Sequence, residues 1–421
     1  METLNNEDIL IKISNLKFKY NKKQKEHNVD IDKLEIQENQ IISLLGPSGS
    51  GKTTLLNLIL GYLKPNEGSI EIKNKPLIYE IAYIMQENST YEDTTVFNNV
   101  FLSAKNYSKW VDSARLKYFE NLFSALDVNA ESNKKLFSKF EVYKQYIASG
   151  KQSNLKKKIA YLSLVFSCLN NKNIKGKSKV LSQIRLRNLF RNEINDVAKK
   201  LEIDHLLHKR VDKLSGGQKQ RVAFAKGIIK KTNLVLMDEP FSALDAKIKE
   251  STIEWLIKIK REFDLSIIVV THDQQDALKL SDQIILLKDG KVQQYSSGDR
   301  MYDSPNNLFV AKFIGAPEIN FVNTKDGKHY YIRQNKLKVD LNKDGAYSIQ
   351  SKKNFGDKTY YQIEYNDNNI WTIVLKDSTI EVNDKVDITF SDADVLVFRL
   401  MKAIEFMHNS RIKKAKSMNC F

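Results

Sequence analysis

The strongest chemical pattern in the chain is a glycine-rich loop that ends in lysine and threonine. The segment GPSGSGKT, residues 46–53, follows the apolar run Ile41 to Leu45 and precedes a helix-like stretch from Thr54. Glycines let backbone N–H groups and a helix N-terminus point at phosphate oxygens, while Lys52 neutralises phosphate charge and the Thr53 hydroxyl binds Mg²⁺. An ordinary Gly/Ser turn is the plainer alternative, but strand, spacing and terminal Lys-Thr together favour a site for ATP or GTP.

Two neighbouring acids at the end of a second apolar run could complete such a site. Asp238 and Glu239 follow Leu234 to Met237, an uninterrupted apolar segment typical of a buried parallel strand. An acid beside a phosphate loop can hold Mg²⁺ through water, and the next carboxylate can polarise an attacking water. We therefore predict that Asp238 binds Mg²⁺ and that Glu239 is the general base. Taken alone, a strand that ends in two acids is as often an exposed turn.

The segment LSGGQ at residues 214–218 lies shortly before the acidic strand. Ser215 could cap a helix whose first N–H groups bind an anion, and a capped helix with flexible glycines is the plainer alternative. In this position the segment resembles the nucleotide-binding signature of the ABC transporter family. Further motifs extend the resemblance: Gln86 after IAYIM resembles the Q-loop of that family, SALD at 242–245 resembles its D-loop, and His272 in VTHD resembles its switch histidine.

The resemblance implies a role for each of these residues. Gln86 would sense Mg²⁺ and the attacking water, His272 would contact the γ-phosphate, and both would act with Glu239 in catalysis. Without the other motifs, a lone Gln or His would be an ordinary surface or core residue. Tyr20 resembles the aromatic that stacks on adenine, although Phe18 lies close by. The implied nucleotide contacts are Tyr20, Gly46, Ser48, Gly49, Gly51, Lys52, Thr53 and Thr54. The implied metal ligands are Thr53, Gln86 and Asp238. The signature residues, which would meet the ATP of a partner subunit, are Ser215, Gly216, Gly217 and Gln218, and the D-loop residues are Ser242 and Asp245.

Composition limits the class of protein. The chain has 421 residues, 42% hydrophobic and 28% charged, which suits two or three folded domains and excludes wholesale disorder. With two cysteines, Cys168 and Cys420, in no pairing or metal-ligand pattern, we expect a reducing compartment, no disulfide and no zinc. The acidic, polar N-terminus does not resemble a signal peptide, and the longest apolar run, Ile159 to Leu169, is too short to span a bilayer as a helix.

The pattern along the chain predicts the domain organisation. Strand-like and helix-like runs alternate around the phosphate loop and again around the acidic strand, whereas residues between them have helical periodicity, and alternating Val, Ile, Tyr and Thr follow Pro317. We predict an α/β P-loop NTPase of the ABC cassette type, with a helical subdomain enlarged by an insertion, and a small C-terminal β-barrel of the OB type. The predicted ranges are 1–95 and 211–315 for the cassette core, 96–210 for the helical subdomain with its insertion at about 105–185, 316–405 for the β domain, and 406–421 for a basic tail.

The resemblance also points to a branch of the family. DQQDAL at 273–278, SD at 281–282, Gly290, Gln293, YDSP at 302–305 and NLFVAKFIG at 307–315 resemble the importers that carry a C-terminal regulatory β domain. The segment APEINF at 316–321 is more similar to the sugar and glycerol-phosphate importers than to the polyamine importers. We therefore expect an ATPase that energises carbohydrate or glycerol-phosphate import, with spermidine/putrescine import as the alternative. The partly matched β-domain motifs YIRQ at 331–334 and DVLVF at 394–398 leave a regulatory ligand site there open.

Partners and location follow from the same resemblance. It implies a second ATP-binding subunit, in the simplest case an identical chain, two transmembrane permease subunits and an extracellular solute-binding protein. It places the chain peripherally on the cytoplasmic face of the cell membrane, with ATP and Mg²⁺ as cofactors.

The positive charge is unevenly distributed. The chain carries 67 Lys and Arg against 51 Asp and Glu, a formal charge of +16, and residues 105–185 alone hold 17 of the former and 5 of the latter. That stretch could contact anionic lipid head groups or an acidic partner, or it could be a solvated insertion without a role. A non-transport ABC ATPase acting on nucleic acid or ribosomes is the competing class. The single cassette and the absence of sustained heptads argue against it, so we expect no nucleic-acid partner.

Overall fold

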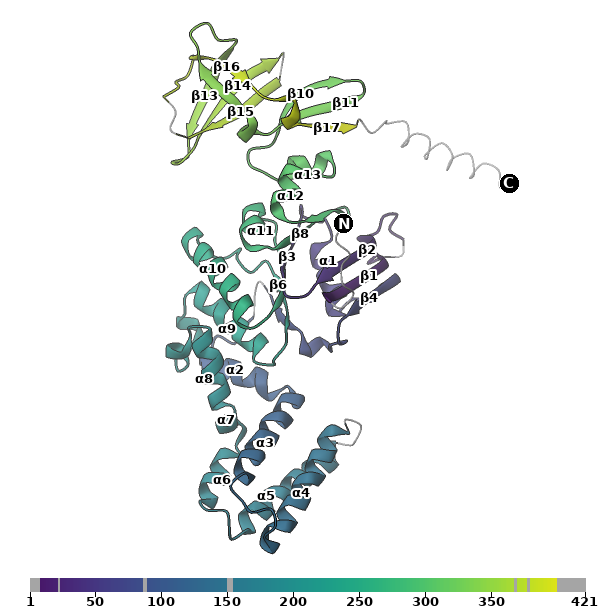
Figure 1. Cartoon of the computed structure of the whole chain (residues 1–421), viewed down its shortest axis with the longest axis vertical. Coiled ribbons are helices and arrows are strands. Elements are labelled where there is room, and N and C mark those ends of the chain that lie inside the picture. The colour runs from purple at the N-terminus through teal and green to yellow at the C-terminus, as the bar shows by residue number, and fades with distance from the viewer. Residues whose placement is uncertain are drawn as a thin grey trace, which may run out of the picture. The chain divides into compact units, whose positions relative to one another are not determined.

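The computed structural model describes residues 8–399 except 22, 86–88, 150–153, 367–368 and 377–378. The chain divides into two compact units after Val292, and each is described here by itself (Figure 1). The sequence places the start of the β domain at residue 316, whereas the second unit begins at Gln293. The second unit therefore also includes two short helices.

A sheet forms the centre of the first unit, and its strand order is β5-β6-β7-β3-β8-β9. Its edge strand β9 begins in this unit and continues past Val292. The strands are β3 (Ile41–Leu45), β5 (Ala82–Ile84), β6 (Leu234–Asp238), β7 (Ser266–Val270), β8 (Gln283–Lys288) and β9 (Lys291–Ser296). The pairings from β5 through β6, β7 and β3 to β8 are all parallel. All of β3 and β7 is buried, as their mainly apolar sequences predict, and the only polar side chains in them are those of Ser43 and Ser266.

Helices and a second, antiparallel sheet surround the central sheet of this unit. The helices are α1 (Lys52–Leu60), α9 (Gly216–Ile228), α10 (Ala246–Glu262) and α11 (Gln274–Leu280). The second sheet has the order β2-β1-β4 and comprises β1 (Ile9–Phe18), β2 (Val29–Gln37) and β4 (Glu67–Ile72). In Figure 1 this sheet lies beside α1, on the side of the central sheet away from α9 and α10.

Helices predominate among the described residues between β5 and α9. The helices are α2 (Val96–Lys105), α3 (Ser108–Phe123), α4 (Glu131–Ala148), α5 (Asn154–Asn170), α6 (Lys177–Gln183), α7 (Leu186–Leu189) and α8 (Arg191–Lys200). Helices α3 to α6 enclose a hydrophobic core of their own, which includes Phe119, Phe140, Tyr143 and Cys168. A separate core means that these helices can fold around one another without drawing apolar residues from the central sheet.

The second unit begins with two short helices and continues as antiparallel strands. The helices are α12 (Gly298–Asp303) and α13 (Leu308–Phe313). The sheets have the orders β10-β11-β17 and β12-β16-β13-β14-β15. The strands are β10 (Asn320–Lys325), β11 (Lys328–Ile332), β12 (Lys338–Leu341), β13 (Tyr347–Asn354), β14 (Thr359–Asn366), β15 (Asn369–Leu375), β16 (Lys385–Thr389) and β17 (Val395–Arg399).

The core of the second unit is centred on Trp371. Its indole Nε1 donates to the carbonyl oxygen of Phe321 at 2.6 Å, and its ring stacks on Tyr365 with centroids 3.6 Å apart. The predicted fold class, an α/β core with a helical part and a small C-terminal β domain, is confirmed. Among the described residues, no helix combines the length and the hydropathy that crossing a membrane requires.

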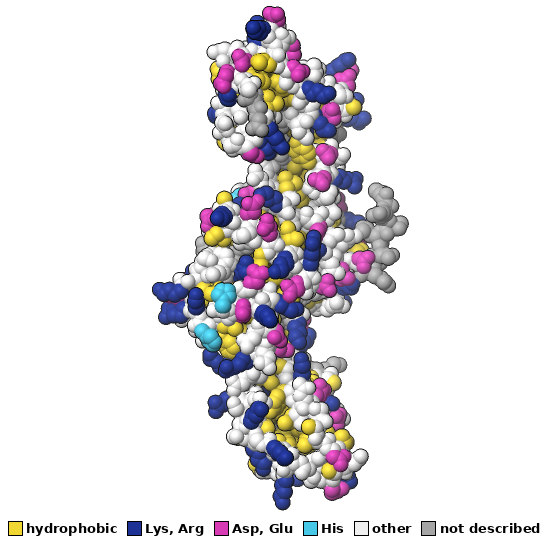
Figure 2. Space-filling view, turned by 60° about the vertical axis from the view of Figure 1, so that its left-hand side comes forward, with side chains coloured by type: hydrophobic (Ala, Val, Ile, Leu, Met, Phe, Trp, Pro, Cys, Tyr) yellow, Lys and Arg dark blue, Asp and Glu magenta, His cyan; other side chains and the backbone are white. Residues whose placement is uncertain are grey.

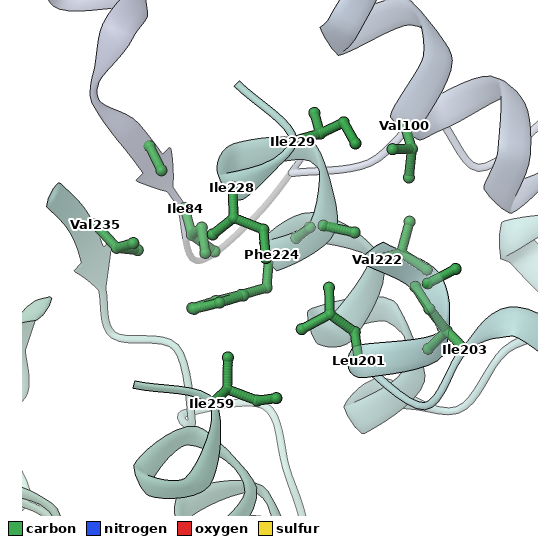
Figure 3. Packing of buried hydrophobic residues seen from close by; sticks show 14 of the residues in the cluster. Ile84, Val100, Leu201, Ile203, Val222, Phe224, Ile228, Ile229, Val235 and Ile259 are labelled. Carbon is green, nitrogen blue, oxygen red and sulfur yellow. The ribbon is translucent and has the colours of Figure 1, made fainter. Parts of the chain in front are cut away.

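The main core of the first unit joins the central sheet to the helices (Figure 3). Phe224 of α9 is fully buried and lies among Ile84 of β5, Val235 of β6 and Ile259 of α10. Its ring meets that of Trp255 edge-on, with centroids 5.4 Å apart. Phe224 therefore holds α9, the helix that begins within the LSGGQ segment, against two strands and a second helix.

Replacing Phe224 by Ala should lower the free energy of unfolding of this unit by about 3 to 5 kcal/mol, because a buried aromatic ring is lost and a cavity remains. Urea unfolding followed by circular dichroism measures the change. The control is Tyr62→Ala, which removes an exposed aromatic side chain and should cost less than about 1 kcal/mol. A Phe224→Ala loss no larger than the control would show that this packing does not hold α9 in place.

Candidate functional site

Three strand ends meet at one edge of the central sheet. In the parallel register, Leu44 of β3 lies beside Val270 of β7, and Val270 lies beside Asp238 of β6. The phosphate loop, the Asp238-Glu239 pair and the Thr271-His272 pair therefore all leave the sheet at the same level. Segments far apart in the sequence become neighbours because the carboxyl ends of parallel strands share one edge.

The glycines of the phosphate loop are required by space as well as by conformation. Gly46 has a φ of 152°, and a Cβ atom there would lie 2.2 Å from the carbonyl oxygen of Leu287. Gly51, with a φ of 100°, is the N-cap of α1, and its Cβ would lie 2.5 Å from the carbonyl oxygen of Asn28. The loop can therefore press against β8 and the β1–β2 connection only with glycine at these positions.

Lys52 is the first residue of α1 and folds back over the loop. Its Nζ donates to the carbonyl oxygens of Gly46 at 2.8 Å and Pro47 at 2.9 Å. Burial lowers the pKa of the Lys52 ammonium, and the nearby Glu239 and Asp238 partly oppose that shift. The side chain is thus positioned where the loop and the N-terminus of α1 converge, which is where an anion would be bound.

Asp238 and Thr53 form the other side of this arrangement. Burial and the neighbouring Glu239 raise the pKa of Asp238, while Lys52 and a hydrogen bond from the Thr53 side chain oppose the rise. Mg²⁺ prefers oxygen ligands and commonly takes one or two from protein, with substrate phosphates and water supplying the rest. A hydroxyl and a carboxylate in hydrogen-bond contact fit that requirement. No cluster of three or more His, Cys, Asp or Glu suited to a metal occurs in the part of the chain that the structure describes.

Glu239 and His272 are brought together from the ends of β6 and β7. His272 Nδ1 lies 3.0 Å from Glu239 Oε1. The Glu239 backbone adopts a φ of 45°, rare for a residue with a side chain, and its N–H donates to the carbonyl oxygen of Val270 at 3.0 Å. The Ser242 hydroxyl donates to the Glu239 carbonyl oxygen at 3.0 Å. The Glu239 backbone is therefore held on both sides by hydrogen bonds, and the carboxylate itself is contacted by His272.

Tyr20 lies beside α1. Its hydroxyl is 3.2 Å from Thr54 Oγ1, its ring is largely exposed, and the edge of Phe18 packs against it with centroids 5.0 Å apart. The sequence left the choice between Tyr20 and Phe18 open. Phe18 is buried and Tyr20 is exposed, so Tyr20 is the one of the two that can offer a ring face to a ligand.

The predicted signature residues form the N-terminus of α9. Ser215 Oγ accepts from Gln218 N at 3.4 Å, and Gln218 Oε1 accepts from Ser215 N at 3.2 Å, which makes a capping box. A Cβ on Gly216 would lie 2.8 Å from the Leu244 side chain, and one on Gly217 would lie 3.1 Å from that of Ile248. Both glycines thus allow close packing against the predicted D-loop and the helix that it starts.

A cavity of about 430 Å³ lies between the signature and the D-loop. Its lining includes Gly216, Lys219, Glu239, Ser242 and Leu244. Asp245, at the end of the D-loop, caps α10 by accepting from Ile248 N at 3.0 Å. Among the described residues, the lining includes none from the phosphate loop. Within one chain, the signature therefore shares a cavity with the acidic strand end and not with the phosphate loop.

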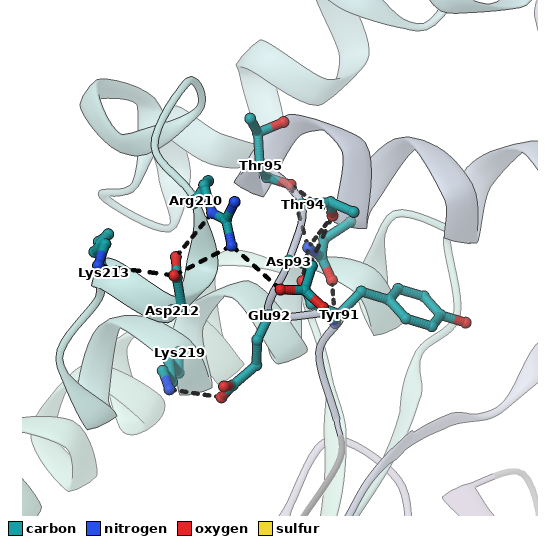
Figure 4. Close-up of polar contacts among 10 residues, drawn as sticks. Tyr91, Glu92, Asp93, Thr94, Thr95, Arg210, Asp212, Lys213 and Lys219 are labelled. Atoms are coloured by element: carbon teal, nitrogen blue, oxygen red, sulfur yellow. Dashed lines mark hydrogen bonds and ion pairs between the residues drawn. The ribbon is translucent and has the colours of Figure 1, made fainter.

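Gln86, predicted as the Q-loop residue, lies outside the described residues. Residues 92–94 are held against residues 210–211, before the signature, and against Lys219, just after it (Figure 4). Val211 N donates to the Thr94 carbonyl oxygen at 3.0 Å, Glu92 pairs with Lys219 at 2.6 Å, and Arg210 Nη2 lies 3.2 Å from Asp93. Exposed ion pairs contribute little singly, so the backbone hydrogen bonds supply most of this connection.

Lys226 makes a second link to the segment after Gln86. From α9 it donates to the Ser89 carbonyl oxygen and lies 4.7 Å from the centre of the Tyr91 ring. Burial lowers its pKa to about 8. The helix that begins with the signature is therefore tied to the Q-loop region at both ends.

Two residues of the site region were missed from the sequence. Ser50 lies inside the phosphate loop, and its hydroxyl is buried without a hydrogen-bond partner among the described residues. Lys249 of α10 pairs with Asp273 and Asp276 at 3.0 Å each, and Asp273 caps the helix that follows His272. Ser50 could have been found from its place in the loop motif, whereas nothing in the sequence connects Lys249 to residue 273.

Comparison with known proteins gives consistent results. A family model described as ABC transporter matches residues 29–242. A protein named spermidine/putrescine import ATP-binding protein PotA from Mesomycoplasma hyopneumoniae strain J is 29% identical over 360 residues, which cover 80% of this chain and 79% of the relative. The protein of the same name from Mycoplasmopsis synoviae strain 53 is 31% identical over 330 residues, covering 74% of this chain and 70% of the relative. Among solved structures, cbiO1 from Clostridium perfringens, part of the ABC transporter complex cbiONQ, matches with a TM-score of 0.46 and 20% identity over 69% of this chain and 89% of that one.

The obstruction at Gly46 yields a test of the loop geometry. Gly46→Ala would place a methyl group against the Leu287 carbonyl oxygen, and strain of about 1 to 3 kcal/mol corresponds to about 5- to 150-fold in an equilibrium constant. We expect nucleotide affinity, measured with a fluorescent ATP analogue, to weaken by about that factor and Tm to fall. Gly49→Ala is the matched control for Tm, because its φ is 78° but its Cβ would meet no atom within 4 Å. Equal falls in Tm would show that the contact with Leu287 does not matter.

Proposed function

The chain belongs to the ABC transporter family as an ATP-binding subunit that hydrolyses ATP to drive solute import, and we propose that the solute is a polyamine of the spermidine or putrescine type. The observation that carries this proposal is that both relatives are named as spermidine/putrescine import proteins and that the similarity to them extends over most of both chains. The preference for carbohydrate or glycerol phosphate, taken from residues 316–321, is not supported by these relatives. Six residues are weak evidence beside similarity that extends over 330 residues or more.

We propose that ATP binds along the phosphate loop with its adenine at Tyr20. The N–H groups at the start of α1 and the Lys52 ammonium would bind the β- and γ-phosphates. The exposed ring of Tyr20 would stack on the base, a contact that its hydrogen bond to Thr54 orients. The buried position of Lys52 supports this assignment, because phosphate oxygens would supply the negative charge that its surroundings only partly provide.

We propose that Thr53 and Asp238 hold Mg²⁺, with Gln86 as a third contact. When bound, the ion would neutralise charge on the phosphates and orient the γ-phosphate. The hydrogen bond between Thr53 and Asp238 supports the assignment, because it already places the two oxygen ligands together. Gln86 rests on its place in the motif alone.

Glu239 is proposed as the general base of hydrolysis. Its carboxylate would accept a proton from water as the water oxygen bonds to the γ-phosphorus and the bond to the β–γ bridging oxygen breaks, which yields ADP and phosphate. His272, 3.0 Å from Glu239 Oε1, would hold the carboxylate in orientation and contact the γ-phosphate through its ring. Because neither residue comes from the loop that binds the phosphates, the reaction depends on the alignment of three strand ends.

We propose that the working unit is a dimer of these subunits. The cavity between the signature and the D-loop lies apart from the phosphate loop of the same chain, which supports a signature that meets the ATP of a second copy. Two membrane permease subunits and an extracellular solute-binding protein would complete the transporter, with this chain on the cytoplasmic face of the membrane. A nucleic-acid or ribosome function has no support among the relatives reported above.

Replacing Glu239 by Gln should leave ATP binding within about twofold and reduce hydrolysis by about 10²- to 10⁴-fold, because the amide cannot accept the proton. The measurement is ATP turnover by the chain co-purified with its permease subunits, alongside equilibrium binding of a fluorescent ATP analogue. The matched control is Glu254→Gln, which makes the same change at an exposed carboxylate on α10, outside the site. Turnover in Glu239→Gln equal to that in the control would remove Glu239 from the role of base.

The solute is tested with the complete transporter in proteoliposomes. We expect ATP-dependent uptake of labelled spermidine or putrescine at least about tenfold above that of maltose or glycerol 3-phosphate, a ratio that needs about 1.4 kcal/mol of discrimination. Transporter assembled with Glu239→Gln shows the background without hydrolysis. Uptake of maltose or glycerol 3-phosphate in preference to both polyamines would overturn the proposed solute and leave the ATPase assignment intact.

A further inference from the structure

One face of α5 is apolar and exposed. Leu155, Ile159, Leu162 and Phe166 are each between 55 and 65% exposed, and they recur every three or four residues, so they lie on one side of the helix. The opposite side carries the buried Leu164 and Cys168, which pack into the core of α3 to α6. We call these four exposed side chains the α5 stripe. A stripe of this size facing water marks a surface that contacts something else.

Lysines surround the α5 stripe. Lys156 and Lys158 lie on α5 itself, which contains no acidic residue. From α4, Lys135 and Lys139 line a depression of about 190 Å³ beside Phe166, together with the amide side chain of Asn170. Figure 2 shows hydrophobic side chains gathered on the helical part at the bottom of the view, with Lys and Arg on one side of them and Asp and Glu along the other. Along α5, the stripe has lysines near its start, Lys156 and Lys158, and lysines of α4 beside Phe166 near its end.

The acids of the same helices are already paired. Asp112 binds Lys157 at 2.5 Å, Glu131 binds Lys134 at 2.5 Å, and Glu141 binds Lys144 at 3.2 Å. They therefore neutralise lysines other than those that surround the stripe. The positive charge of the lysines around the α5 stripe can therefore be neutralised by an anionic partner outside the chain.

We propose that the α5 stripe docks on the surface of an anionic lipid bilayer. The four apolar side chains would enter the boundary between head groups and acyl chains, with the helix lying in the membrane plane. Lysine stems would extend to place their ammonium groups among the phosphates, and the depression lined by Lys135 and Lys139 would receive a lipid phosphate beside the inserted Phe166.

Charge and shape favour this occupant over others. In a pair of α5 helices from two copies of the chain, packed in either direction, Lys156 and Lys158 would face lysines of the other copy, and like charges at such a seam are destabilising. The four side chains lie along the exposed side of one helix, so they suit a broad surface better than a narrow acidic peptide. The docking needs neither ATP hydrolysis nor a particular solute, and it therefore goes beyond the proposed function and can be tested apart from it.

The test is co-sedimentation of the purified full-length chain with vesicles of seven parts phosphatidylcholine to three parts phosphatidylglycerol. We expect Ile159→Ser and Phe166→Ser to weaken binding by about tenfold each, since each removes an inserted apolar side chain. Replacing Lys156 and Lys158 by Gln should weaken binding by about fivefold for each lysine. Raising the salt concentration should weaken the wild-type interaction and affect the lysine variant less.

Matched controls separate the stripe from general surface effects. Val128→Ser, at an exposed apolar residue of the same helical region outside the stripe, should bind as the wild type does. All variants keep the basic segment 411–421, so a loss of binding cannot be attributed to it. Unchanged affinity for a fluorescent ATP analogue verifies that each variant is folded.

Several outcomes would overturn the proposal. These are vesicle binding by Ile159→Ser and Phe166→Ser equal to that of the wild type, or equal binding of the wild type to vesicles of pure phosphatidylcholine. A further contradicting outcome would come from sedimentation equilibrium without vesicles or nucleotide. If the wild type is a dimer there and Phe166→Ser is a monomer, a second copy of the chain covers the stripe.

Discussion

The parallel register of β6, β7 and β3 is the constraint on which the site depends. It places Asp238, Val270 and Leu44 side by side, and each strand delivers a different chemical group where it ends. A shift of one residue in either pairing would turn the side chains of a strand to the opposite face, separating Glu239 from His272. The three strands are almost entirely buried and their side chains are packed on both faces, so a shift would disrupt that packing. The precision of the polar site therefore rests on the packing behind it.

The groups assembled at this edge are individually unfavourable there. Burial lowers the pKa of Lys52 and raises that of Asp238, so each would lose part of its charge if it stood alone. Together they partly offset one another, and the Thr53 hydroxyl supports Asp238 further. The pKa of Lys52 stays lowered and that of Asp238 stays raised, so neither charge is fully compensated by the protein. Negative phosphates beside Lys52 and a divalent cation beside Asp238 would compensate both.

The helical region and the C-terminal unit are built on separate cores. Helices α3 to α6 pack around Phe119, Phe140 and Tyr143, and the second unit packs around Trp371 and Tyr361. Neither core draws side chains from the central sheet. The insertion can therefore be long, basic and apolar on its outer face while the register of the nucleotide-fold strands is preserved, and a contact made by α5 would leave the site geometry unaltered.

The sequence by itself determined the features that depend on near neighbours in the chain. These are the glycine loop at 46–53, the apolar strand ending in Asp238, the capped helix at Ser215 and the strand-rich C-terminus, because glycine spacing, helix capping and periodicity act over a few residues. Only the tertiary structure decided which strands are adjacent, and thereby the 3.0 Å contact between Glu239 and His272. It also decided which apolar face of α5 is buried, since both faces read alike in sequence. Pairings across long stretches of chain are selected by how whole elements pack, and no local pattern contains that information.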